Sequence, residues 1–142
     1  MKRLYYDPNK CMGCKACEIA CAVGKSVSGD LLQAVREKTR PGSRVKVRAF
    51  EGKNFPLACR HCKKHPCVAA CIAAALRYDK KSQRVIHDKD RCTGCWMCIM
   101  VCPYGAIRND DNLKIPLRCD LCADTDAPRC LQACPVGAII YE

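Results

Sequence analysis

The residues best suited to chemistry in this chain are its 16 cysteines, which fall into four groups of four among 142 residues. The third group reads Cys92-Thr93-Gly94-Cys95-Trp96-Met97-Cys98-Ile99-Met100-Val101-Cys102-Pro103, a C-x2-C-x2-C-x3-C-P spacing. Three thiolates from one tight loop can bind three corners of a cubane-shaped [4Fe–4S] cluster. Where two such clusters are neighbours, the fourth cysteine of the run ligates the other cluster. The third group therefore predicts both a cluster and a partner group.

The other three groups are variants of the same spacing. They are Cys11, Cys14, Cys17 and Cys21; then Cys59, Cys62, Cys67 and Cys71, with a longer middle gap; and finally Cys119, Cys122, Cys130 and Cys134. The pattern Pro-x-Gly-Ala-Ile follows the last cysteine of two groups, at 103–107 and at 135–139. This recurrence indicates an internal repeat, and four groups predict four [4Fe–4S] clusters.

Disulfides and zinc are the competing uses for so many cysteines. Residues 1–7 contain no apolar signal segment and no twin arginine, and no run of 18 apolar residues occurs. We therefore expect a cytoplasmic setting, which disfavours disulfides. Zinc sites pair C-x2-C units at longer separations and do not need three evenly spaced cysteines followed by C-P. Iron–sulfur ligation is the interpretation that fits best.

The formal charge of +11 counts every thiol as neutral. A [4Fe–4S] cluster with four thiolates carries about −2, so four clusters would leave a net charge of roughly +3. Basic residues concentrate between positions 36 and 64: Arg36, Lys38, Arg40, Arg44, Lys46, Arg48, Lys53, Arg60, Lys63 and Lys64. They form either a solvated surface that compensates the clusters or a docking face for an acidic partner, centred on Arg44, Lys46 and Arg48. No nucleic-acid-binding motif accompanies this charge.

Short elements are expected between the cysteine groups. They are strands at 4–6, 44–50 and 137–141, a helix at 31–38 capped by Asp30, a hairpin of 73–78 with 84–87, and strands starting at 105–107 and returning at 113–117. The predicted fold class is α+β, with two pseudo-repeated two-cluster ferredoxin modules built from short strands and short helices.

The second and third groups are separated by one hairpin, which is the separation used within a single two-cluster module. We therefore expect an inner module at 55–107, an outer module formed by 1–30 and 108–142, and a basic insertion at 28–54. In this arrangement the first and last strands, at 4–6 and 139–141, are expected to pair with each other. Sequential pairing of groups one with two and three with four is the alternative. Nesting predicts four ligand sets: Cys11, Cys14, Cys17 and Cys134; Cys119, Cys122, Cys130 and Cys21; Cys59, Cys62, Cys67 and Cys102; Cys92, Cys95, Cys98 and Cys71.

Other residues near the cysteines have simpler expected roles. Trp96 is expected to shield a cluster from water rather than to relay electrons. His61 and His65 lie inside the second group, but its four cysteines suffice, so no histidine ligand is expected. Titration of either histidine beside a cluster could tune it. No constellation for substrate chemistry is evident, so we predict an electron-transfer protein and not an enzyme.

The four groups, with Cys-Arg-His-Cys at 59–62 and Arg-Cys-Thr-Gly-Cys-Trp-Met-Cys at 91–98, resemble those of four-cluster electron-transfer subunits. The family is that of dimethyl sulfoxide reductase and formate hydrogenlyase, and the resemblance is greatest to the CooF-type subunit of carbon monoxide dehydrogenase. It implies transfer between that catalytic enzyme and a flavin-dependent NAD(P)H oxidoreductase or hydrogenase module. A subunit of an aldehyde oxidoreductase or formate dehydrogenase, or a freely diffusing polyferredoxin, stays open.

Overall fold

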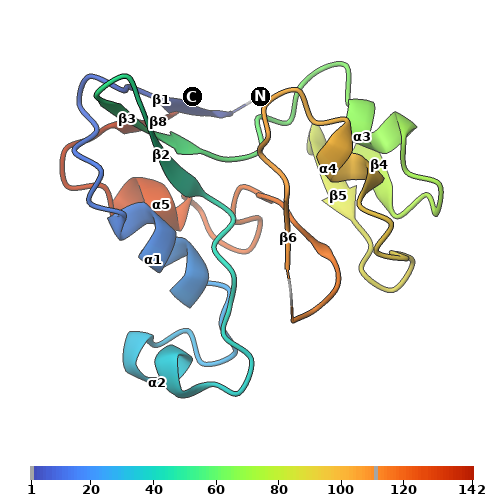
Figure 1. Cartoon of the computed structure of the whole chain (residues 1–142), viewed down its shortest axis with the longest axis horizontal. Helices are drawn as coiled ribbons and strands as arrows, with labels where there is room; N and C mark the ends of the chain where they lie inside the picture. Colours follow the sequence, from blue (N-terminus) through green and yellow to red (C-terminus); the bar gives the residue numbers. More distant parts are fainter. Residues whose placement is uncertain (1, 111) are drawn as a thin grey trace.

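The computed structural model describes residues 2–110 and 112–142. The strands are β1 (Leu4–Tyr6), β2 (Lys46–Phe50), β3 (Lys53–Leu57), β4 (Leu76–Asp79), β5 (Arg84–His87), β6 (Arg108–Asn109), β7 (Pro116–Leu117) and β8 (Ile139–Tyr141). The helices are α1 (Ala16–Val23), α2 (Leu31–Arg36), α3 (Pro66–Ala69), α4 (Met97–Met100) and α5 (Arg129–Gln132). The described strands form four antiparallel pairs (Figure 1).

The two ends of the chain are paired. β1 and β8 are antiparallel, with Leu4 opposite Tyr141, and α1 packs against α5 beneath them (Figure 1). Leu4 and Ile139 are almost completely buried in a core, called the outer core below, that also contains Cys17, Cys21, Cys119 and Cys130. The pairing predicted for the first and last strands is therefore confirmed.

A second core, called the inner core below, lies beside the outer core. β4 and β5 form the expected hairpin, with Leu76 opposite His87, and α3 packs on both α4 and β4. Leu76, Val85 and Ile107 are buried there with Cys67 and Cys98. In Figure 1 this group stands to the right of the sheet formed by the chain ends.

The insertion between the first two cysteine groups contains a hairpin that only partly follows the predicted pattern. β2 confirms the strand expected at 44–50, and Val45 and Val47 are buried in the outer core. The second strand, β3, was not expected. Glu51 and Gly52 connect the two strands, and both have positive φ, 47° and 72°. This is the geometry of a two-residue type I′ turn, in which glutamate is an uncommon residue.

The expected helix after Asp30 is confirmed, but its apolar face is not covered. The Asp30 carboxylate accepts a hydrogen bond from the Gln33 amide at 3.0 Å, as an N-cap does. The helix ends at Arg36 because Glu37 leaves it and accepts hydrogen bonds from the amides of Val27 and Ser28. Ala34 is buried in α2, whereas Leu32 is 75% exposed.

The strand predicted to start at 105–107 begins later in the structure. Ala106 and Ile107 are buried but not paired, and the short strand β6 begins only at Arg108. It pairs with β7, so Arg108 lies opposite Leu117.

Within residues 2–110 and 112–142, no helix combines the length and apolar character needed to cross a bilayer.

Candidate metal centres

One backbone conformation recurs in all four cysteine groups. The residue just before the second cysteine has positive φ in each: Gly13 (75°), His61 (45°), Gly94 (69°) and Leu121 (59°). A left-handed residue between neighbouring peptides turns their N–H groups toward one side, which makes a concave site for a negative charge. The non-glycine residues His61 and Leu121 adopt this conformation at some steric cost. The repeated turn therefore suits loops that surround an anionic group.

A second conformation recurs at the start of the helices. Lys15, His65 and Trp96 are left-handed N-cap residues of α1, α3 and α4, each two positions before the third cysteine of its group. The helix that follows carries that third cysteine inward, as the burial of Cys67 and Cys98 shows. The fourth group differs because Pro128, with φ −58°, precedes α5.

Cysteines from the first and last groups meet between α1 and α5. Burial, together with the negative charges of Glu18, Cys11 and Cys134, raises the pKa of Cys17 to about 11. Burial also raises the pKa of Cys130 to about 12, with additional repulsion from Cys21 and Cys122. Two sets of neighbouring thiols thus form where the ends of the chain come together.

The pKa of Cys119 is raised strongly by burial, and its negative neighbours are Cys130, Cys21 and Cys59. The structure therefore brings Cys21, from the first group, among three cysteines of the fourth: Cys119, Cys122 and Cys130.

The second and third groups meet in the inner core. Burial raises the pKa of Cys67, and repulsion from Cys59, Cys62 and Cys102 adds to this effect. Burial raises the pKa of Cys98 to about 11, with Cys67, Cys92 and Cys95 as negative neighbours. One narrow cavity is lined by Cys71, Cys92, Cys95 and Cys98, and by Trp96.

The electrostatic interactions between cysteines also indicate the order in which the sets of thiols follow one another. Cys130 has Cys17 as a neighbour, Cys119 has Cys59, and Cys98 has Cys67. Each of these three electrostatic interactions joins two of the sets of thiols described above, which places the sets one after another in a row. The exposed cysteines Cys14 and Cys95 belong to its two ends.

Several N–H groups donate to the sulfurs. The amide of Arg44 donates to Cys21 Sγ at 3.3 Å, that of Leu121 to Cys119 Sγ at 3.4 Å and that of Ala138 to Cys134 Sγ at 3.3 Å. Such bonds stabilise a negatively charged sulfur. Mutual repulsion among buried thiols opposes their ionisation, and a bound cationic iron core would relieve it. The residues present therefore fit iron–sulfur clusters.

In the described part of the chain, no three His, Cys, Asp or Glu side chains converge closely enough to hold a single metal ion. A single zinc ion contacts its ligands directly. A cubane places an iron–sulfide core between its four thiolates, and so needs a wider ring of cysteines.

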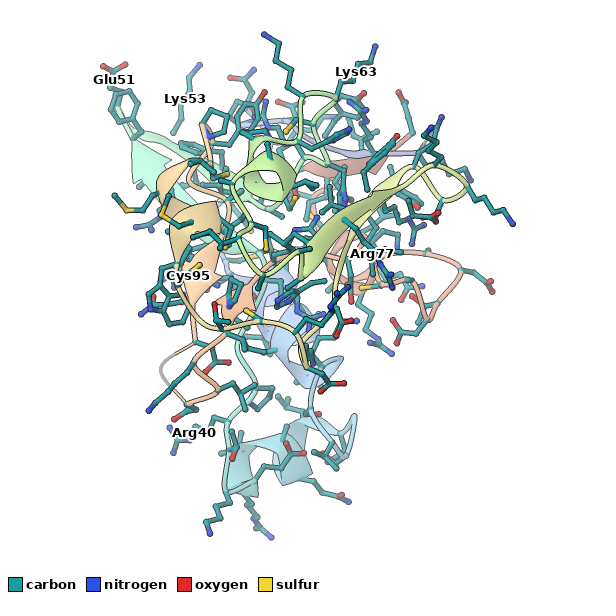
Figure 2. The ribbon with its side chains drawn as sticks, turned by 90° about the vertical axis from the view of Figure 1, so that its right-hand side faces the viewer. Arg40, Glu51, Lys53, Lys63, Arg77 and Cys95 are labelled. Carbon is teal, nitrogen blue, oxygen red and sulfur yellow. The ribbon has the colours of Figure 1, made fainter. Side chains whose placement is uncertain are left out.

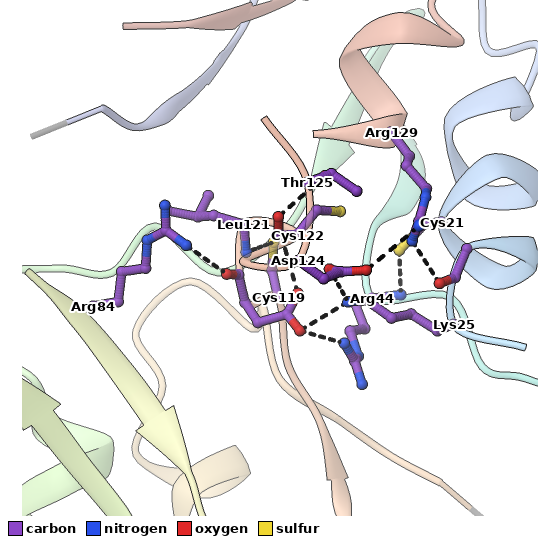
Figure 3. A network of polar contacts seen from close by, with 12 residues as sticks. Cys21, Lys25, Arg44, Arg84, Cys119, Leu121, Cys122, Asp124, Thr125 and Arg129 are labelled. Carbon is purple, nitrogen blue, oxygen red and sulfur yellow. Dashed lines mark hydrogen bonds and ion pairs between the residues drawn. The ribbon is translucent and has the colours of Figure 1, made fainter. Parts of the chain in front are cut away.

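The basic residues proposed as the centre of a docking face are mostly used inside the molecule. Arg44 Nη1 contacts Asp120 Oδ2 at 2.8 Å, and Lys25 Nζ reaches the same oxygen at 3.0 Å (Figure 3). Lys46 Nζ contacts Glu18 Oε2 at 3.1 Å, whereas Arg48 is exposed. Reversing the charge of these arginines and lysines would therefore disturb contacts between α1, β2 and the fourth cysteine group.

Sequence reasoning missed a buried polar group between the two cores. Arg118 is 5% exposed; its Nη1 donates to the Val85 carbonyl at 2.5 Å and its Nη2 to Cys59 Sγ at 3.4 Å. His61 is 2% exposed, and its Nδ1 accepts from the Val85 amide at 3.2 Å. Burial, followed by the charges of Arg118 and Arg84, lowers the pKa of His61 to about 3. The expected tuning by His61 titration therefore lacks support near neutral pH.

Two protein-family models match this chain, one at its N-terminal cysteine group and one over the other three groups. Residues 50–142 match the 4Fe-4S dicluster domain, and residues 4–23 match the 4Fe-4S binding domain. The chain belongs to the 4Fe-4S dicluster domain family. As a member of this family of ferredoxin-type electron-transfer proteins, it carries multiple [4Fe–4S] clusters.

Individual relatives are similar to this protein along almost the whole of its chain. An iron-sulfur protein of Rhodospirillum rubrum is 35% identical, over 96% of this chain and 79% of that protein. The electron transport protein HydN of Escherichia coli is 34% identical, over 94% of this chain and 83% of its own length. A sulfite dehydrogenase subunit of Allochromatium vinosum is 34% identical, over 97% of this chain and 67% of its own length.

A solved structure has a similar fold. The active site complex BamBC of benzoyl coenzyme A reductase contains a chain that aligns with a TM-score of 0.56 at 23% identity. The alignment covers 100% of this chain and 76% of that one.

Proposed function

We propose that this protein is an electron-conducting subunit with four [4Fe–4S] clusters in two nested ferredoxin modules. The proposed ligand sets, in the order of the row, are Cys11, Cys14, Cys17 and Cys134; Cys21, Cys119, Cys122 and Cys130; Cys59, Cys62, Cys67 and Cys102; Cys71, Cys92, Cys95 and Cys98. The observation that carries this proposal is that cysteines from different groups meet as nesting requires, for example Cys17 with Cys134. Sequential pairing would instead keep Cys134 with the third group.

The module boundaries are part of the proposal. We assign 55–107 to the inner module, 1–30 with 108–142 to the outer module, and 28–54 to the insertion. Two separate cores support this division. Val45, Val47 and Ala58 pack in the outer core, so the insertion hairpin and the first residues of the inner range join the outer module structurally.

The clusters, when bound, supply one-electron transfer. The chain's contribution is to position the thiolates, to exclude water from the middle of the row and to leave its ends accessible. The second set, Cys21, Cys119, Cys122 and Cys130, is completely buried, and the third set has one buried and three half-buried cysteines, whereas each end set has an exposed one, Cys14 or Cys95. A row with a buried middle and two accessible ends suits a conduit that connects two redox partners.

We further propose a catalytic redox enzyme at one end and a second oxidoreductase at the other, in the cytoplasm. Carbon monoxide dehydrogenase is our choice for the first partner, on the resemblance of the cysteine groups. A flavin-dependent NAD(P)H oxidoreductase or a hydrogenase module is the choice for the second. The names of the relatives support a role in oxidoreductase assemblies, since one is part of a sulfite dehydrogenase and another is an electron transport protein.

Iron and acid-labile sulfide analysis of anaerobically purified protein tests the cluster content. Four cubanes require about sixteen iron atoms and as many sulfides per chain, and fewer than about twelve iron atoms would contradict four clusters. Anaerobic pull-down then tests the partners, with assays of the captured material for oxidation of carbon monoxide, formate, aldehydes and hydrogen. Capture of carbon monoxide dehydrogenase activity alone supports the proposed partner, and capture of another of these activities replaces it.

A further inference from the structure

Arg118 is a buried cation between the two cores. It immediately precedes Cys119, a ligand proposed for the outer module, and donates through Nη2 to Cys59, a ligand proposed for the inner module. Its Nη1 donates to the carbonyl of Val85 on β5. The side chain of Arg118 therefore reaches from the outer module, where its backbone adjoins Cys119, to Val85 and Cys59 of the inner module. It crosses the junction at which the second and third ligand sets of the proposed row meet.

The surroundings of Arg118 contain no ordinary counter-charge. Among residues 2–110 and 112–142, no carboxylate oxygen lies within ion-pair distance of its guanidinium. The nearby Asp120 carboxylate is paired with Lys25 and Arg44 instead. A buried charge without compensation is very unfavourable. The acidic groups that face Arg118 are thiols: Cys59 by direct contact and Cys67 through its charge.

His61 helps to hold the guanidinium in place. Its Nδ1 accepts from the Val85 amide at 3.2 Å and lies 3.3 Å from Arg118 Nη2. Val85 thus binds both residues, His61 through its amide and Arg118 through its carbonyl. The imidazole contacts the guanidinium without supplying a negative charge, so the acidic groups near the cation are the cysteines.

We propose that Arg118 is a positioning residue that favours the reduced state at the junction of the two modules. This inference rests on the proposed function. Adding one electron makes a [4Fe–4S] site more negative, so a fixed cation and an N–H···S bond both stabilise the reduced form. Arg118 thereby raises the reduction potential of the site at Cys59, Cys62, Cys67 and Cys102, and of its neighbour at Cys119. Without it, electrons crossing between the modules would meet a step to lower potential in the buried middle of the row.

The test compares Arg118→Gln and Arg118→Lys in the full, anaerobically purified chain, with Arg77→Gln as a matched control. Arg77 is exposed on β4 (Figure 2). Midpoint potentials come from redox titration monitored by electron paramagnetic resonance, after iron and sulfide analysis of each protein. We expect Arg118→Gln to disfavour reduction of the junction site at least tenfold, or 59 mV for a one-electron couple. Arg118→Lys should give a smaller shift in the same direction, because its ammonium keeps the charge but loses the two-pronged contact. Arg77→Gln should leave all potentials unchanged.

Wild-type potentials in a fully loaded Arg118→Gln protein would overturn the inference and leave the proposed conduit intact. If Arg118→Gln fails to fold or to load, Arg118→Lys decides: a lowered junction potential supports the inference and a wild-type potential overturns it. Hyperfine coupling to ¹⁵N-arginine provides an independent signal, expected in the reduced junction site of the wild type and weakened in Arg118→Lys. An iron content in the wild type too low for four clusters would overturn the proposed function and the inference together.

Discussion

Cys14 and Cys95 occupy the same position in the first and third cysteine groups, and they are the two exposed thiols among the sixteen. Each follows a glycine with positive φ, Gly13 or Gly94. The pair therefore marks equivalent accessible points at opposite ends of the proposed row, whereas Cys119 and Cys130, assigned to the set between them, are buried. The accessible ends and the buried set between them give the proposed conduit a pattern of accessibility that can be probed chemically.

Limited exposure to oxygen should damage the two ends first. Oxidants reach exposed sites most readily, so the sets that contain Cys14 and Cys95 should release their thiols before the set of Cys119, Cys122 and Cys130. Brief air exposure, anaerobic quenching, alkylation and mass spectrometry will identify the released cysteines. We expect several-fold more labelling of the end sets at early times, on the order of the accessibility difference. Labelling that starts at Cys119 or Cys130 would contradict the proposed order.

The loop of the third group should be sensitive to a methyl group at Gly94. A Cβ there would lie 2.6 Å from the carbonyl oxygen of Lys114, and the residue has φ 69°. Gly137→Ala is a matched control, because φ is 60° and no atom lies within 4 Å of the added Cβ. Both changes incur a left-handed backbone cost of about 1–2 kcal/mol, and Gly94→Ala should add about 1–3 kcal/mol of overpacking.

The rate of cluster loss on heating, followed by absorbance near the sulfur-to-iron charge-transfer bands, measures this difference. Gly94→Ala should lose absorbance faster than Gly137→Ala, and the first site to be lost should be that of Cys92, Cys95 and Cys98. Equal rates for the two variants would show that the contact with Lys114 relaxes without effect.

Asp120 should stabilise the loop of the fourth group in two separable ways. Its Oδ2 pairs with Lys25 and Arg44, and its Oδ1 accepts from the Cys122 amide at 3.1 Å. Asp120→Asn keeps the acceptor and removes the charge, which should cost about 1 kcal/mol or less because the carboxylate is partly exposed. Asp120→Ala also removes the acceptor and should cost about 1 kcal/mol more.

Thermal loss of clusters and iron content measure both effects, with the exposed Asp126→Asn as the control. The expected order of retention is wild type and Asp126→Asn, then Asp120→Asn, then Asp120→Ala. If Asp120→Ala behaves like Asp120→Asn, the bond to Cys122 does not order the loop.

Cysteine spacing carries much information about this architecture because ligands of a cluster must lie close together in space. It predicts the pairing of β1 with β8 and the β4–β5 hairpin, both of which the structure contains. Hydrophobic alternation likewise predicts β2. By contrast, Gly52 indicates that the chain turns back after β2, but it does not indicate that the returning residues form the strand β3.

Contacts across the junction could not be predicted because spacing along the chain does not determine which side chains meet between modules. Arg118 and His61 are 57 positions apart and become neighbours only when β5 packs against the fourth cysteine group. Similarly, the charges of Arg44 and Lys46 read from the sequence as free surface cations. Folding pairs them with Asp120 and Glu18.

The most direct test of the nested row is Cys102→Ser, with Cys62→Ser and Cys95→Ser as references. Cys102 follows α4, which carries Cys98, but we assign it to the site of Cys59, Cys62 and Cys67. The electron paramagnetic resonance spectrum of reduced Cys102→Ser should therefore change in the same component as that of Cys62→Ser, while the component altered by Cys95→Ser stays as in the wild type. A change confined to the component that Cys95→Ser alters would contradict the exchange of the fourth ligand and the nested arrangement built on it.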